Sequence, residues 1–111
     1  MFGSAVTVEL AGDVDRGRVD ALRSALRLKS EGRFEDGWDE ILGRRTDEVE
    51  GGRLQILLHR DDTAGPWAFH VNAEGEPSAE ALRAVEEEVA AAARANGLTV
   101  AAVSRRTDRR P

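Results

Sequence analysis

The two histidines, His59 and His70, are the only side chains of this sequence whose unperturbed pKa lies near neutrality. Each stands in a run of residues typical of a β-strand. The alternation of side chains along a strand predicts both imidazoles on the same face of a sheet. Glu9, in a third predicted strand, belongs to that face as well. Two imidazoles and a carboxylate suit a divalent metal ion, and a His–Glu pair can act as a general base.

A flat sheet face offers no pocket by itself, and both of these chemistries need one. We therefore predict Glu9, His59 and His70 as a ligand-binding group, with no metal site and no cofactor. The alternative is that both histidines are ordinary surface residues. No other motif points to a reaction: the chain has no cysteine, no phosphate-binding glycine loop and no GxSxG nucleophile turn. The sequence favours a non-catalytic protein.

The elements that must position these residues follow from the hydrophobic pattern. Val6, Val8 and Leu10 alternate with polar residues, which indicates a half-buried strand. Apolar residues at helical spacing predict helices over about 15–29 and 78–95, the second beginning at Ser78 and ending at Asn96-Gly97. Further strands are predicted over 53–60, 66–72 and 98–103, and the first two of these form a hairpin across the turn 61–65.

The segment 32–52 is the least regular part of the chain. Phe34, Trp38, Ile41 and Leu42 are spaced as on one face of a short helix, which Gly43 would end. One interpretation is a lid over an end of the core. The other is an exposed docking helix that presents Phe34 and Trp38 to a partner.

This order of elements resembles the ferredoxin-like β-α-β-β-α-β arrangement. The resemblance rests on element order alone. It implies an α+β fold with a four-stranded antiparallel sheet, both helices on one face, and the extra short helix in the 32–52 connection. The first and third strands are then central and pair with each other. We expect one domain over 1–103, followed by a disordered arginine-rich tail over 104–111.

The face of this sheet away from the helices is predicted to be open. In the last strand either Leu98, Val100 and Ala102 or Thr99, Ala101 and Val103 face the core. The first set is favoured because it is larger, which leaves Ala101 and Val103 on the open face with Leu57 and Ala68. An apolar centre with a polar rim is typical of a protein–protein surface. We therefore predict a partner-binding surface formed by these open-face residues and the aromatic segment: Leu57, Ala68, Ala101, Val103, Phe34 and Trp38.

Charge narrows the class of partner. The chain has a net charge of −5, and the tail contains four arginines and one aspartate, so the rest of the molecule is more acidic than the total. An acidic body repels phosphate backbones, so nucleic acid is an unlikely partner, and no apolar stretch is long enough to span a membrane. We predict a cytoplasmic protein-interaction or regulatory module, with a homodimer as one form. The alternatives are a small-ligand-binding protein or small enzyme near His59 and His70, and an acidic immunity or antitoxin-like inhibitor.

Overall fold

The computed structural model describes residues 2–34, 40–60 and 66–105, which form six strands and two helices. In chain order they are β1 Gly3–Ala11, α1 Arg16–Ala25, β2 Lys29–Ser30, β3 Ile41–Val49, β4 Gly52–Arg60, β5 Trp67–Gly75, α2 Ala79–Ala95 and β6 Thr99–Arg105. Within these ranges no helix has the length and apolar character needed to cross a bilayer.

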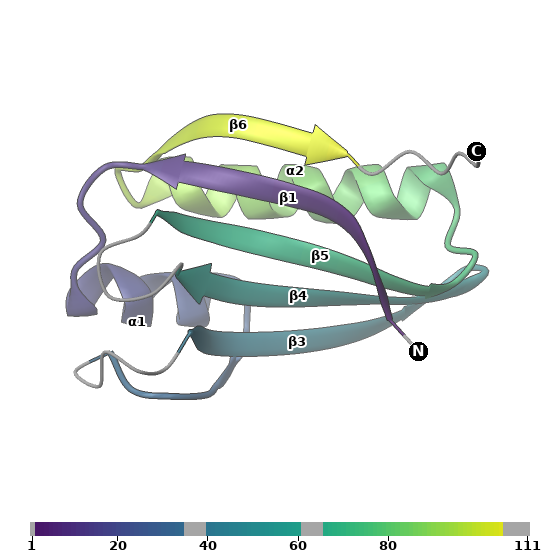
Figure 1. Ribbon diagram of the computed structural model, residues 1–111, viewed down its shortest axis with the longest axis horizontal. Coiled ribbons are helices and arrows are strands. Elements are labelled where there is room, and N and C mark those ends of the chain that lie inside the picture. The colour runs from purple at the N-terminus through teal and green to yellow at the C-terminus, as the bar shows by residue number, and fades with distance from the viewer. Residues whose placement is uncertain (1, 35–39, 61–65, 106–111) are drawn as a thin grey trace.

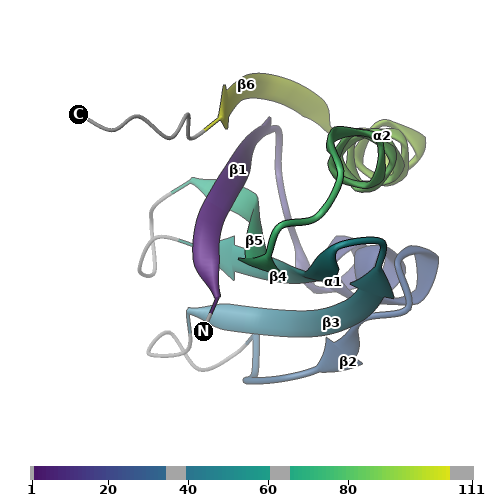
Figure 2. The ribbon, with the colours of Figure 1, turned by 90° about the vertical axis from the view of Figure 1, so that its right-hand side faces the viewer.

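The strands form one antiparallel sheet in the order β2-β3-β4-β5-β1-β6. Both helices lie on the same side of this sheet, which curves around them (Figures 1 and 2). The prediction of a four-stranded ferredoxin-like sheet is wrong, because β3 and β2 extend the sheet beyond β4 to a total of six strands. The predicted pairing between the first strand and the second strand of the hairpin is confirmed by the β1–β5 register.

The predicted short helix in the 32–52 segment is wrong. Ile41 and Leu42, which were assigned to it, begin β3, and Leu42 is fully buried against the helices. Trp38 lies outside the described residues. The error has a physical cause: the residues of β3 that face the helices include the charged Arg45 and Asp47, which lie opposite Ile56 and Leu54. An apolar alternation, the usual signal of a half-buried strand, is therefore absent.

The helices begin where the sequence predicts, because Asp15 and Ser78 each accept a hydrogen bond from a backbone N–H of the first turn. The end of α2 at Asn96 is also confirmed. Helix α1 ends earlier than predicted, at Ala25. Arg27 then takes a left-handed conformation, and Lys29 begins β2, where it pairs with Arg44 of β3.

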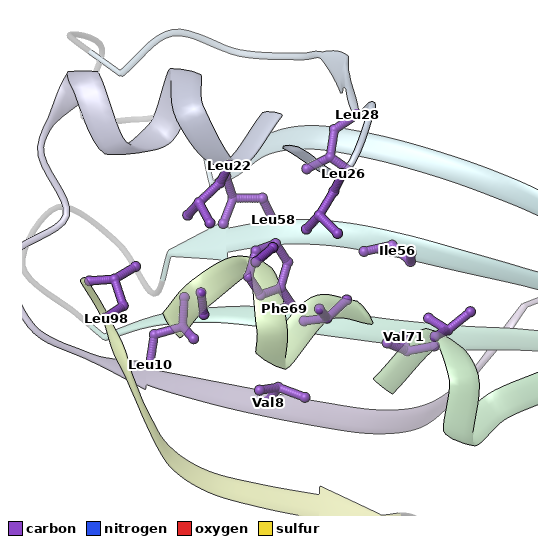
Figure 3. Packing of buried hydrophobic residues seen from close by; sticks show 14 of the residues in the cluster. Val8, Leu10, Leu22, Leu26, Leu28, Ile56, Leu58, Phe69, Val71 and Leu98 are labelled. Atoms are coloured by element: carbon purple, nitrogen blue, oxygen red, sulfur yellow. The ribbon is translucent and has the colours of Figure 1, made fainter. Parts of the chain in front are cut away.

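The core lies between the sheet and the two helices (Figure 3). Phe69 of β5 is fully buried in this cluster, together with Leu22, Leu26 and Val89 from the helix layer. Of the nine strand residues predicted to face the helices in β1, β4 and β5, Trp67 is half-buried and the other eight are buried. These are Val6, Val8, Leu10, Leu54, Ile56, Leu58, Phe69 and Val71.

An ionic cluster closes the core beside β3. The guanidinium of Arg45, whose side chain is only 9% exposed, bonds both carboxylate oxygens of Asp47 and of Glu88 at 2.8–3.0 Å. It also donates to the carbonyl of Leu26 at 2.7 Å. The same hydrogen bonds lower the pKa of Glu88 and raise that of Arg45. One side chain thus ties β3 to α2 and to the end of α1.

Candidate functional site

Two surfaces contain residues that the sequence singled out. The first is a hollow on the open face of the sheet, where β4 ends and β5 begins. It has a volume of ≈ 300 Å³ and is lined by Thr7, Glu9, His59, Pro66, Ala68 and His70; we call it the histidine hollow. It therefore brings together all three residues predicted as a ligand-binding group.

The register of the sheet explains how the histidines meet. His59 pairs with Ala68, and Leu57 pairs with His70, so the two imidazoles are diagonal neighbours on one face. Their ring centroids lie 4.6 Å apart, with the planes inclined at 68°. Glu9 also pairs with Ala68, from the β1 side, and so completes the row His59–Ala68–Glu9.

Burial in the hollow favours neutral imidazole at His70. Thr7 Oγ1 and His70 Nδ1 are 3.0 Å apart. Burial lowers the pKa of His70, and the neighbouring His59 lowers it further. An unprotonated Nδ1 accepts a hydrogen bond from the threonine hydroxyl. The His59 Nε2 lies 3.5 Å from a carboxylate oxygen of Glu40. Thr7 was not among the predicted site residues, although it alternates with Val6 and Val8 and so shares the face of Glu9.

The imidazoles and the carboxylate of the hollow do not converge as metal ligands do. Across the ranges 2–34, 40–60 and 66–105 no three His, Asp or Glu side chains gather closely enough to hold a metal ion. What the hollow offers is two imidazoles, a hydroxyl and a carboxylate beside the apolar walls of Pro66 and Ala68.

The five predicted partner-binding residues that the structure describes, all except Trp38, do not form one surface. Leu57 and Ala68 are only 8% and 6% exposed. Each is flanked in the register by larger polar side chains, Leu57 by Arg44 and His70, and Ala68 by His59 and Glu9. The centre of the open face therefore presents polar groups, including the hydrogen-bonded pair Gln55 and Asn72.

Phe34 also lies away from the open face. Its ring stacks on Trp67 with centroids 6.1 Å apart, and it packs against the core. The guanidinium of Arg60 lies 5.6 Å from the centroid of each ring and donates to the Phe34 carbonyl at 3.2 Å. Phe34 itself is thus packed at the end of the sheet where β4 ends and β5 begins.

The second surface is at β6, which contains the other two predicted partner residues. The register shifts between Glu9 and Leu10, so that Val100 lies opposite Leu10 and Val103 opposite Val8. Both valines therefore face the helix side, while Ala102 lies opposite Glu9 on the open side. The assignment of Ala102 to the core and of Val103 to the open face is reversed by this irregularity, which no periodic pattern reveals.

A shallow hollow of ≈ 190 Å³ runs between β6 and α2, lined by Val8, Glu86, Glu87, Ala90, Arg94, Val100 and Val103. Figures 1 and 2 show β6 and α2 side by side along this margin of the molecule. We call the outer side of β6 together with this hollow the β6 edge. Val103 is 38% exposed here, the one large apolar side chain so exposed within the described ranges.

The two margins of the sheet differ in chemistry. At one margin β2 has only two residues, and the rest of β3 beside it is charged, with Arg45, Asp47 and Glu48. At the other, β6 has seven residues, and none before Arg105 is charged. Charge and short strands discourage the addition of another strand, so only the β6 margin is left receptive.

Comparisons of the chain with models of protein families, with curated proteins and with solved structures found no match.

Proposed function

We propose that this chain is a non-catalytic protein-interaction module that binds its partner along the β6 edge. The observation that carries the proposal is the unprotected β6 strand. It is seven residues long, uncharged up to Arg105 and last in the sheet, and it contains the exposed Val103. Among the described residues no strand pairs with its outer side.

Such an edge binds polypeptide in a defined way. A partner strand adds to the sheet through main-chain hydrogen bonds, and pockets for alternate side chains provide selectivity. Here the hollow between β6 and α2 would receive apolar side chains over Val100 and Val103, while Glu87 and Arg94 form a charged rim. The buried positions of Leu57 and Ala68 make the centre of the open face a weaker candidate for this role.

The test is site-specific photo-crosslinking in cells that make the protein naturally. A photoreactive amino acid replaces Val103 in one variant and Thr46, an exposed residue of β3, in the matched control. We expect a discrete crosslinked product at position 103 that is missing at position 46. Equal products at the two positions, or none at position 103, would contradict the proposed function.

A second candidate function is binding of a small ligand in the histidine hollow. It is favoured by the gathering of Thr7, Glu9, His59 and His70 around one hollow of ≈ 300 Å³, the low end of the range for ligand sites. Apolar walls beside an exposed carboxylate suit a small amine with an apolar body. Titration with benzylamine should shift the imidazole NMR signals of His59 and His70 to saturation, and Glu9→Gln should weaken this binding while Glu48→Gln leaves it unchanged. Absence of saturation would reject this candidate.

A further inference from the structure

We infer that the partner at the β6 edge is a second copy of this chain, related by a two-fold axis that passes between the midpoints of the two β6 strands. This inference rests on the proposed function and makes its occupant specific. Three independent features support it: the order of residues along β6, the position of α2 over that strand, and the charges on α2.

The sequence of β6 is nearly the same in both directions. Thr99, Val100 and Ala101 are followed by Ala102, Val103 and Ser104. Antiparallel pairing of two copies about the point between the alanines sets each Val100 opposite Val103 of the second copy. It also sets alanine opposite alanine, and threonine opposite serine. A two-fold interface requires this self-complementarity, and opposed β-branched and hydroxyl pairs stabilise a sheet.

The irregularity in β6 makes this pairing consistent with the two faces of the sheet. Side chains that are directly opposite each other in an antiparallel pair must point to the same face. In a regular strand Val100 and Val103, three residues apart, would point to opposite faces. The register shift turns both toward α2, as their common hollow shows. The valines of two copies would therefore meet on the helix side and cover each other's exposed surface.

The position of α2 allows the helices to follow the strands. Helix α2 packs on both β1 and β6, so its axis lies above the boundary between them. Neighbouring strands are about 4.8 Å apart, so continuing the sheet through two β6 strands would place the two α2 helices roughly 10 Å apart. That separation is typical of packed helices. Ala90, which lines the hollow between β6 and α2, is small enough to permit the approach.

The charges on α2 are complementary under the same symmetry. Glu87 and Arg94 are both exposed and line the hollow beside β6, seven residues apart on α2. Within the described part of the chain neither has an ion-pair partner. The two-fold axis reverses the direction of α2, so that each Glu87 lies toward Arg94 of the other copy. Two equivalent pairs of opposite charge result, and opposite charges across an interface fix its register.

The experiment measures the mass of the purified full chain by sedimentation over a wide concentration range. We expect a monomer–dimer equilibrium. Val103→Lys should weaken the association by roughly tenfold or more, because it places a charge in the apolar contact with Val100 of the second copy. The matched control Thr46→Lys adds the same charge on β3 and should leave the equilibrium unchanged. Circular dichroism and thermal melting establish that each variant is folded.

A charge exchange tests the symmetry itself. Glu87→Arg alone and Arg94→Glu alone each oppose like charges at two equivalent places, so each should weaken the dimer by roughly tenfold. The double variant restores opposite charges and should recover wild-type association. A dimer that Val103→Lys and both single exchanges leave intact would overturn the inference, because its interface would lie elsewhere.

A chain that stays monomeric at every concentration would also overturn the inference, but not the proposed function. The crosslinked product at position 103 distinguishes the two: a product of two identical chains supports self-association, whereas a product with a different protein supports only the binding role of the edge. Without any product at position 103, both fail.

Discussion

His70 is held in an environment that disfavours its charged form. Its ring is partly buried, and the neighbouring His59 ring lies 4.6 Å away. Burial is the larger cause of its lowered pKa, and the charge of His59 is the smaller one. Two carboxylates face the pair of histidines. Glu9 lines the same hollow, and a carboxylate oxygen of Glu40 lies 3.5 Å from His59 Nε2.

This environment predicts a loss of stability in mild acid. Because the pKa of His70 is lower in the folded chain than its ordinary value near 6.5, the unfolded chain binds more protons between the two values. The free energy of unfolding should therefore fall as the pH decreases through about 6.5. Urea unfolding at several pH values measures the slope, and His70→Gln should reduce it. If the slope were unchanged in that variant, His70 would not be the group responsible for the pH dependence of stability.

The sequence could predict the gathering of His59, His70 and Glu9, because strand alternation fixes the face and hairpin pairing fixes the neighbours. It could not predict the burial of Leu57 and Ala68. Their low exposure depends on the larger side chains that flank them on the two neighbouring strands. One of these strands, β3, provides Arg44 and has no strand-like pattern in the sequence.

At the scale of elements, the strands with an apolar inner face were predictable and β3 was not. The apolar alternation of Val6, Val8 and Leu10 predicts β1 directly, whereas the residues of β3 that face the helices include Arg45 and Asp47. A guanidinium takes the place of an apolar side chain there because Glu88 of α2 and the Leu26 carbonyl complete its hydrogen bonds. These partners are 43 and 19 residues away along the chain. Local periodicity contains no information about them.

The Arg45 cluster leads to a prediction about stability. Arg45→Ala leaves Asp47, Glu88 and the Leu26 carbonyl without their donor, and should lower the free energy of unfolding by about 2–4 kcal/mol, since both carboxylates retain some contact with water. Arg44→Ala removes the half-exposed pair with Glu31 and should cost less than about 1 kcal/mol. Chemical denaturation of the two variants compares them, and equal losses would show that the cluster is not special.

At the scale of the whole molecule, the two margins of the sheet predict different responses to protein concentration. Amide hydrogen exchange in β6 should slow as the protein is concentrated, because pairing with a second copy satisfies its outer N–H groups. Exchange along residues 45–48 of β3 should not change. Mass spectrometry of the exchanged peptides compares dilute and concentrated samples. Slowing at β3, or equal slowing at both margins, would contradict pairing through β6.

The difference between the margins also sets how far assembly can proceed. A sheet with two receptive edges is bivalent, and strand addition at both would continue without limit into a fibre. Here β2 and the charged part of β3 leave the opposite margin unreceptive, so the molecule is monovalent for strand addition. Once two copies have joined through β6, neither has an edge to offer a third. Pairing through β6 therefore uses the one receptive edge of each copy, and association stops at two copies. The product is a closed twelve-stranded sheet made from two six-stranded ones, and it does not grow into a polymer.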